Sequence, residues 1–259
     1  MGSTVAATCS GQRWWVGHRR SAASRRRADA VGLRDAGTLA ELVERVDTIV
    51  SVCPPSSALD VARTVASTGF GGIYIDANAV APAQATGMAE LFERFVDGGI
   101  VGPPATVAGT TRMYLSGSEA TSVAERWAGS ALDVRVVPGP IGAASALKMS
   151  YAGWTKGQAA LLLAVNALAD AYDVGDTLRA EWDISQPGLE QRSAATAHGV
   201  VAKAWRFEGE MHEIAATLEA VDLPGGFHRG AAEIYRRMAD LRHADEPTLD
   251  DVIDALRRT

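Results

Sequence analysis

Short apolar runs alternate with longer amphipathic stretches from Arg13 to about residue 137. The runs are rich in β-branched and aromatic residues, as strands are, and they read "RWWVG", "TIVSVC", "IYIDAN", "GIVGPP", "MYLSG" and "VRVV". Stretches such as "SAASRRRADAVG", "TLAELVERV" and "AQATGMAELFERF" between them have the apolar spacing of helices. Strands that alternate with helices predict an α/β domain around a mostly parallel sheet, and we assign it to residues 1–138.

Strand patterns end after this domain. From Ala143 to about Asp173 nothing breaks a helix decisively, because Gly153 and Gly157 each cost only about 1 kcal/mol. At about 1.5 Å per residue, this segment predicts a helix on the order of 45 Å long. Further helical patterns follow, so we expect residues 139–259 to form an all-helical domain. This order predicts a nucleotide-binding half and a substrate or dimerisation half, with a site in the cleft between them.

The long helix carries few charges, so it is apolar nearly all round and must be covered on every side. The small helical domain cannot cover a helix of this length on every side. We therefore expect a homodimer through the helical domain, in which a second copy of the chain covers the remainder.

Composition excludes several classes of protein. The net charge of -6 argues against a general nucleic-acid surface, and the two cysteines give neither a disulfide framework nor a metal-ligand cluster. The longest mainly apolar run, residues 159–169, is far shorter than the roughly 18 to 20 residues that cross a bilayer, so no membrane segment is expected. The first residues lack the pattern of a secretory signal, and the cytoplasm is the expected location.

Arginines crowd the segment after the first apolar run. If "RWWVG" is the second strand of a doubly wound nucleotide-binding domain, the loop after it, "GHRRS", meets the adenosine ribose. Arg19 and Arg20 suit a 2′-phosphate, since a guanidinium bonds two oxygens at once, and Ser21 adds a hydroxyl while it opens the next helix. No carboxylate precedes Asp29. The loop favours NADP over NAD, and a plain solvated turn is the alternative.

The chain opens "MGSTVAATCSG", which is similar to the end of a glycine-rich phosphate-binding turn and the helix after it. Only Gly2 of such a turn is present. We therefore expect a Rossmann-like domain whose first strand is apparently missing.

Four segments, "GPIGAASALKMSYAGWTKGQAALLLA", "GGIYIDANAVAP", "DGGIVGPP" and "RMYLSG", resemble the β-hydroxyacid dehydrogenase superfamily. That superfamily includes 3-hydroxyisobutyrate and 6-phosphogluconate dehydrogenases, and the likeness is greatest to a bacterial subgroup with a poorly characterised C-terminal helical domain. The resemblance covers essentially the whole chain. It implies a Rossmann-like NADP-binding domain, a long interdomain helix, an all-α C-terminal domain and a homodimer.

The family's catalytic signature is G-x-x-G-x-G-x-x-x-K-x-x-x-N. Gly139, Gly142 and Lys148 match it, whereas Ala144 replaces the third glycine and Ala152 the asparagine. By resemblance, Lys148 is the general acid/base, and hydride transfer at a hydroxyl-bearing carbon does need a group that moves the hydroxyl proton. The alternative is a lysine that extends its stem out of a buried helix. Lys156, eight residues on, points away from that face, so we expect its replacement to be mild.

The family's substrate loop reads "DAPVSGG", but this chain reads "DGGIVGP", so Val101 replaces the serine that binds substrate carboxylate. Because the amide at position 152 is also lacking, we expect a more apolar substrate or different anchors. Aromatic residues near Lys148 line the pocket in this interpretation, and core packing is the alternative for them. The residues that we expect to contact substrate are Val101, Gly102, Tyr151, Ala152 and Thr155.

Pro54 and Asn78 fall at the carboxyl ends of predicted strands, where the family's cofactor-contacting loops lie, although Asn78 could equally be a turn residue. His228 could reach the site from the helical domain, but a lone histidine is more often structural. The residues that we expect to bind cofactor are Gly2, Arg19, Arg20, Ser21, Pro54 and Asn78.

The sequence thus predicts an NADP-dependent oxidoreductase that transfers a hydride between nicotinamide and a hydroxy acid, alcohol or carbonyl substrate. Imine reduction on the same fold is an alternative, but family members of that kind usually carry an acidic residue or tyrosine at the position of Lys148. A catalytically defective NADP-binding or scaffold protein is a third possibility, favoured by the missing strand.

Overall fold

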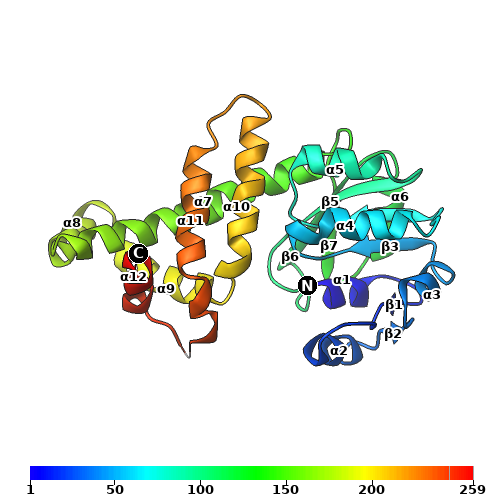
Figure 1. The fold of residues 1–259 in the computed structure, drawn as a ribbon, viewed down its shortest axis with the longest axis horizontal. Coiled ribbons are helices and arrows are strands. Elements are labelled where there is room, and N and C mark those ends of the chain that lie inside the picture. Colours follow the sequence, from blue (N-terminus) through cyan, green and yellow to red (C-terminus); the bar gives the residue numbers. More distant parts are fainter. Residues whose placement is uncertain (245, 259) are drawn as a thin grey trace. The chain divides into compact units, whose positions relative to one another are not determined.

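The computed structural model describes residues 1–244 and 246–258, and it divides into two compact units, Met1–Met149 and Ser150–Thr259. The first unit is α/β and the second is all-helical (Figure 1). This confirms the predicted fold class. The division falls later than the predicted boundary at residue 138, because the first turns of the long helix α7 (Ala143–Ala171) pack on the sheet of the first unit.

The main sheet of the first unit has five strands, β3 (Thr48–Ser51), β4 (Ile73–Asp76), β5 (Phe95–Val101), β6 (Thr111–Ser116) and β7 (Leu132–Val136), in that order. All neighbours pair parallel except β5 and β6. A separate two-stranded parallel sheet joins β1 (Trp14–Trp15) to β2 (Arg34–Asp35). Every predicted strand is present. Strand β2 was not predicted, because its two residues are both charged and exposed.

The helices of the first unit are α1 (Gly2–Thr8), α2 (Ala22–Asp29), α3 (Leu39–Val43), α4 (Pro55–Ala66), α5 (Pro82–Ala89) and α6 (Ala120–Ala124), followed by a 3₁₀ turn, η1 (Glu125–Trp127). Their starts follow local rules. Ser21 and Thr38 accept from backbone N–H groups of the helices that they cap, and Pro55 occupies the first helical position of α4, where no N–H is needed.

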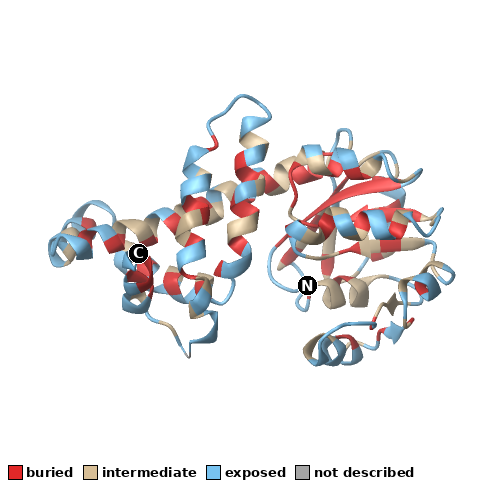
Figure 2. Cartoon of the chain, in the orientation of Figure 1, coloured by how far each residue is buried: buried red, intermediate tan, exposed pale blue. Residues whose placement is uncertain are grey.

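Two apolar clusters cover the two faces of the main sheet. Ile73 and Ile75 of β4 pack with Val5 of α1 on one face, and Tyr74 packs with Met88 of α5 on the other. Strands β4 and β5 are buried along their whole length (Figure 2), as expected for parallel strands covered on both faces. This buried centre is the platform for the polar residues described below.

In the described residues the small sheet, β1 and β2, is separate from the main sheet, and no strand joins the two by hydrogen bonds. Helix α1 is the first element of the chain, as the opening sequence predicts. It packs firmly, since the indole Nε1 of Trp127 donates to the Val5 carbonyl at 3.1 Å. The first residue of the helix, Gly2, lies beside Val52, just after β3.

The second unit consists of the remainder of α7 with α8 (Gly175–Ser185), α9 (Leu189–Val201), α10 (Ala204–Glu219), α11 (Gly226–Arg237), the 3₁₀ turn η2 (Ala239–His243) and α12 (Leu249–Arg257). Helices α10 and α11 run side by side (Figure 1), and Tyr235 of α11 donates from its hydroxyl to the Lys156 carbonyl of α7 at 2.8 Å. The predicted long helix is confirmed and ends two residues before the expected position. Among the described residues, no helix has the length and apolarity to cross a membrane.

Candidate functional site

The carboxyl ends of β3, β4 and β5 form one edge of the main sheet, because the three strands are parallel and in register. Ser51 pairs with Asp76, and Asp76 in turn pairs with Asp97. The loops after β3 and β4 and the last residues of β5 therefore emerge at the same edge. In open α/β sheets, this edge is the one at which ligands bind.

Lys148 lies over this edge, in the second turn of α7. A Cβ added to Gly99 of β5 would be 2.8 Å from the Lys148 Cβ and 3.1 Å from the Ala144 carbonyl oxygen. Only glycine at position 99 lets the helix pack so closely on the strand. The lysine side chain itself is half-buried. The candidate acid/base is thus held against the strand that continues into the predicted substrate loop.

Asp97, two residues before Gly99 on the same face of β5, holds the start of α7. Its Oδ2 accepts from Ser116 Oγ at 2.9 Å, from the Gly142 N–H at 2.9 Å and from the Ser145 N–H at 3.0 Å. Its Oδ1 accepts from Ser145 Oγ at 2.6 Å. Ser116 Oγ also accepts from the Ala144 N–H at 3.1 Å. Three backbone donors at the helix start are satisfied by side chains from the sheet.

The neighbouring carboxyl group, Asp76, is buried in a second polar cluster. The pKa of Asp76 is raised to about 7, mainly because the carboxyl is buried. Hydrogen bonds from Asn78 lower this pKa, and the charge of nearby Asp97 contributes to the rise. Asn78 donates to Asp76 from both its backbone N–H and its side-chain amide. Two aspartates therefore lie side by side at the sheet edge in different surroundings, and the buried carboxyl of Asp76 is partly protonated near neutral pH.

The residues expected to bind cofactor from the β3 and β4 loops lie next to this cluster. The Asn78 amide donates to Ser51 Oγ at 3.0 Å and to Asp76, and its Oδ1 accepts from the Cys53 N–H at 2.6 Å. Both amide hydrogens are thus used within the protein, as for a turn-stabilising residue, and cofactor contact by Asn78 stays a prediction. Pro54 is exposed and precedes α4 directly.

The arginine loop, residues 17–21, follows β1, and its shape depends on Asp35 at the end of β2. The Asp35 carboxylate accepts from the backbone N–H groups of Gly17 at 2.9 Å and Gly37 at 2.8 Å, which hold the pKa of Asp35 below its usual range. A Cβ on Gly17 would fall 2.1 Å from Asp35 Oδ2, so any other residue at position 17 would displace the carboxylate that shapes the loop. The sequence interpretation found no carboxylate near this loop before Asp29 and did not anticipate one from the next strand.

Within the arginine loop, Arg19 and Arg20 are exposed, and neither makes an ion pair in the described part of the chain. Arg19 has a φ of 57°, an uncommon backbone conformation for a residue with a side chain. The charge of Arg20 acts on the Cys53 thiol and lowers its pKa, although burial dominates and raises it. The loop therefore lies near the residues that follow β3. Ser21 caps α2 as predicted.

The residues expected to contact substrate are distributed over both units. Val101 is buried as the last residue of β5, on the same face as Gly99, and Gly102 follows it with a φ of 117°. The other three lie on the part of α7 in the second unit. Ala152 is buried, Tyr151 is exposed, and the Thr155 hydroxyl donates to the Tyr151 carbonyl at 3.0 Å. Their contact with substrate stays a prediction.

His228 lies in the second unit, where its Nε2 is 3.2 Å from the Gly153 carbonyl oxygen. A Cβ at Gly157 would meet the His228 and Phe227 rings, so the small residues of α7 make room for α11. This packing accounts for the histidine structurally.

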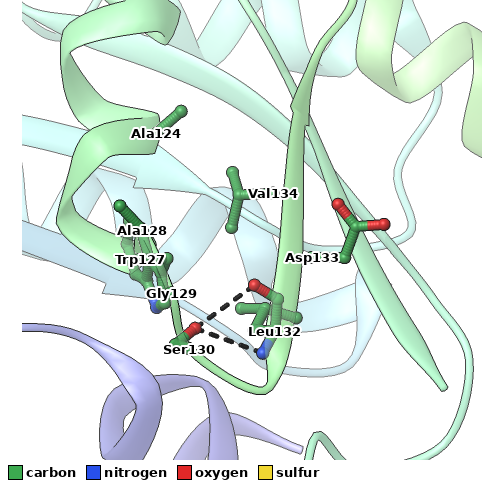
Figure 3. Close-up of a pocket in the computed structure, with 8 residues that line it drawn as sticks. All are labelled: Ala124, Trp127, Ala128, Gly129, Ser130, Leu132, Asp133 and Val134. Carbon is green, nitrogen blue, oxygen red and sulfur yellow. Dashed lines mark hydrogen bonds between the residues drawn. The ribbon is translucent and has the colours of Figure 1, made fainter. Parts of the chain in front are cut away.

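A surface pocket in the first unit lies elsewhere, between α6 and β7 (Figure 3). It is lined by Trp127, Asp133 and their neighbours, and Ser130 Oγ bonds both backbone atoms of Leu132 at its base. None of the residues that carry the predicted chemistry lines it. We attach no function to it.

Comparison with known proteins supports the same fold. Residues 169–238 match the model of a domain of unknown function, DUF1932. A protein of Methanothermus fervidus, "Uncharacterized 28.5 kDa protein in 7S RNA 5'region", is 31% identical over 163 residues, which is 61% of this chain and 62% of that protein. The matched region thus spans less than two thirds of that relative.

Solved structures match nearly the whole chain. A conserved protein of unknown function, described as structurally similar to 3-hydroxyacid dehydrogenases, is 24% identical with a TM-score of 0.66, covering 93% of both chains. The 3-hydroxyisobutyrate dehydrogenase of Salmonella typhimurium is 18% identical with a TM-score of 0.67, covering 98% of this chain and 95% of the enzyme. The predicted likeness in fold to 3-hydroxyacid dehydrogenases is confirmed. At these identities, the likeness is one of fold.

Imine reductases share this β-hydroxyacid dehydrogenase fold. The enzyme of Myxococcus stipitatus, solved in complex with NADP⁺, is 19% identical with a TM-score of 0.53, covering 98% of this chain and 95% of that enzyme. The fold therefore accommodates reduction of both carbonyl and imine carbons, and it does not by itself choose between them.

The imine reductase of this fold from Myxococcus stipitatus was solved with NADP⁺, and the arginine loop of this chain has groups that could bind such a phosphorylated dinucleotide. Two guanidinium groups without a carboxylate partner, next to the Ser21 cap of α2, form a suitable donor set for a phosphomonoester. The glycine-rich turn that would cradle the pyrophosphate is not among the described residues. The fit thus rests on the arginine loop and on the edge formed by β3, β4 and β5.

Sequence reasoning missed the polar residues that organise the site, namely the exposed Asp35 and the buried Ser51, Asp76, Asp97, Ser116 and Ser145. A signal for two of them was present, because "IYIDAN" and "FVDGGI" each place an acid inside an apolar run. An acid at such a position is buried and needs donors. Which donors satisfy it depends on segments far away in the sequence.

Proposed function

We propose that this protein is an NADP-dependent oxidoreductase that transfers a hydride between nicotinamide and a hydroxyl-bearing or carbonyl carbon, with Lys148 as the general acid/base. The observation that carries the proposal is the close packing of the Lys148 Cβ over Gly99, at the ligand-binding edge of the sheet. This contact fixes the backbone of residue 148 against the strand, so the lysine side chain starts from a defined position at this edge.

Each part of the site has a separate task in this proposal. Bound NADP supplies the hydride acceptor or donor. The Lys148 ammonium gives a proton to the carbonyl oxygen during reduction, and the neutral amine takes the hydroxyl proton during oxidation. Arg19 and Arg20 bind the 2′-phosphate, because their exposed guanidinium groups lack a carboxylate partner among the described residues.

The substrate proposal follows from Val101. The apolar side chain of Val101 ends β5 where the family motif, by resemblance, has a serine that binds carboxylate, so this site favours a substrate with an apolar group there. The test is NADP⁺- and NADPH-linked turnover, followed at the nicotinamide absorbance, over a panel of hydroxy acids, alcohols, aldehydes, ketones and cyclic imines. Turnover of a hydroxyl or carbonyl compound that is faster than that of every imine is expected. The absence of turnover across the panel would contradict the proposal.

Imine reduction is the alternative on the same fold, supported by the likeness to imine reductases. Lys148 disfavours imine reduction, since the positive charge of its ammonium group repels a cationic iminium substrate. Faster turnover of the imines in the panel would establish this alternative. A non-catalytic NADP-binding protein would instead bind NADPH, measured by nicotinamide fluorescence, without any turnover.

We further propose a cytoplasmic homodimer, in which a second copy covers an apolar stripe of α7. Trp154, Leu161 and Leu168 recur every seven residues on α7, and they are 70%, 51% and 57% exposed. Residues at this spacing share one helix face, and so large an exposed apolar stripe marks an interaction site. We expect an interface above the roughly 1,600 Å² of a standard complex.

The stripe gives a direct test of the dimer. Leu161→Glu or Leu168→Glu buries a charge in the interface and should produce a monomer near 27.2 kDa in sedimentation at micromolar concentration, where the parent sediments as a dimer. Leu223→Glu, at an exposed leucine outside any helix, is the matched control and should stay dimeric. A parent protein that sediments as a monomer would contradict the proposed dimer. The proposed cytoplasmic location has its own test, cell fractionation, and recovery of the protein only in the membrane fraction would contradict it.

A further inference from the structure

Asp97 is a fully buried carboxylate that hydride transfer does not use directly. It lies on the central strand β5, and no arginine, lysine or histidine side chain is among its hydrogen-bond partners given above. A carboxylate in such a place must be satisfied by hydrogen bonds, and Asp97 accepts four. Two come from backbone N–H groups and two from serine hydroxyls.

The partners of Asp97 all belong to two elements, β6 and the start of α7. Gly142 precedes the helix and Ser145 is its third residue, so Asp97 caps α7 from 48 residues away in sequence rather than from the preceding loop. Ser116 bridges Asp97 to the Ala144 N–H and completes the cap. An anionic group at this position also interacts favourably with the helix dipole.

The cap is linked to Lys148 through short, stiff segments of backbone. Asp97 and Gly99 are alternate residues of one buried strand, and Ser145 and Lys148 are one helical turn apart. The cap fixes the helix at Ser145, and Gly99 fixes how closely the next turn approaches the strand. A helix held at both points has little freedom to slide or rotate along β5, so the Lys148 Cα is placed relative to the sheet edge.

We propose that Asp97 is the positioning residue for Lys148: its buried carboxylate locks the first turn of α7 onto β5 and so fixes where the lysine amine is presented. The part that concerns catalysis rests on the proposed function. The part that concerns the presentation of the amine does not, and it is tested separately.

The first test measures Lys148 without any substrate. Competitive acetylation of the folded protein, read by peptide mass spectrometry, gives the labelling rate of Lys148 relative to exposed Lys203. For Asp97→Asn, which loses the charge but keeps the shape, we expect this ratio to rise by about threefold or more, because the helix start opens locally. Asp97→Ala should raise this labelling ratio further. If the alanine variant does not fold, the ratio measured for Asp97→Asn alone tests the proposal.

Two controls separate a local effect from general unfolding. The labelling of Lys156, which is paired with Glu210 in the second unit, should not change in Asp97→Asn. Asp133→Asn removes a partly exposed carboxylate, paired with Arg135, from β7 of the same unit and should leave the Lys148 ratio at its parent value. An unchanged Lys148 ratio in both Asp97 variants would overturn the proposal, as would a parallel rise at Lys156.

The second test applies to the catalytic part. With the substrate found by the panel, kcat of Asp97→Asn should fall about tenfold to a hundredfold, since displacing a catalytic group by about 1 Å costs this much, while KM for NADP stays within about twofold. A purely structural role would reduce the folded fraction and leave kcat per folded molecule unchanged. That result would overturn positioning for catalysis. If the parent has no activity, the proposed function fails, and the labelling ratio still decides whether Asp97 positions the amine.

Discussion

The start of α7 and the arginine loop both present cationic side chains, but the protein holds them in opposite ways. At α7, buried side chains from β5 and β6 satisfy the backbone, and Lys148 packs over Gly99. The arginine loop is exposed and is shaped mainly by one carboxylate, Asp35, that bonds two N–H groups. A catalytic amine needs a fixed position, whereas a phosphate can be bound by flexible arginines with long reach. The difference in burial and hydrogen bonding therefore matches the difference in the proposed tasks.

The largest expected effect is that of Lys148→Ala. Because Lys148 moves the substrate proton in the proposed reaction, kcat should fall by about 10² to 10⁴, while the dissociation constant of NADPH changes little. Steady-state kinetics and fluorescence titration measure the two quantities. Activity within a few-fold of the parent would leave the lysine as a snorkelling side chain and would remove the functional distinction between the two regions.

The surroundings of the other two lysines decide which of them is a suitable control for Lys148→Ala. Sequence spacing suggests Lys156, whose replacement was expected to be mild. The structure gives a reason to expect a loss of stability instead, because Lys156 forms a buried ion pair with Glu210 and lies 4.3 Å from the centroid of the Phe207 ring. Its removal would leave an unpaired buried carboxylate, which is strongly destabilising. Lys203→Ala is the better control, since Lys203 is exposed at the start of α10.

The sequence predicted the parts of the molecule that depend on local pattern. Strands such as "IYID" and the helix from Ala143 were found because apolar periodicity determines them. The site was predicted only where a motif contains it, as at Lys148. The cap by Asp97 and the loop support by Asp35 could not be predicted, because each joins segments whose proximity exists only in the folded sheet. The ion pair of Lys156 with Glu210 could not be predicted for the same reason.

The second prediction concerns the arginine loop. Arg19→Ala combined with Arg20→Ala should weaken NADP binding by about tenfold to a hundredfold, since hydrogen bonds to charged groups contribute about 1.5 to 3 kcal/mol, and it should leave NAD binding nearly unchanged. Calorimetric titration of both cofactors measures this. Arg26→Ala combined with Arg27→Ala removes the same charge from the last turn of α2 and should have a much smaller effect. If the parent bound NAD as tightly as NADP, the loop would have no role in cofactor choice.

A smaller effect should come from Asp76, which belongs to the buried edge but lies outside the cap of α7. Burial raises its pKa to about 7, from 3.8, so between about pH 4 and 7 the folded protein keeps a proton that the unfolded chain has lost. Stability therefore falls as pH rises through this window and does not fall further above it. Asp76→Asn cannot titrate. Between pH 5 and pH 8, its melting temperature should fall by a few degrees less than that of the parent, measured by calorimetry.

Asp35 in the arginine loop and Asp76 at the sheet edge should affect the pH dependence of stability with opposite signs. The Asp35 carboxyl, with its lowered pKa, should act in the opposite direction: its contribution is present above the unfolded pKa and is lost as pH falls below it. Asp35→Asn should therefore reduce the acid sensitivity of the protein, while Asp76→Asn reduces its loss of stability toward neutral pH. If both variants followed the parent across pH 3 to 8, neither carboxyl would be held as the structure describes. Because Asp35 is largely solvated, the shift that it causes should be the smaller of the two.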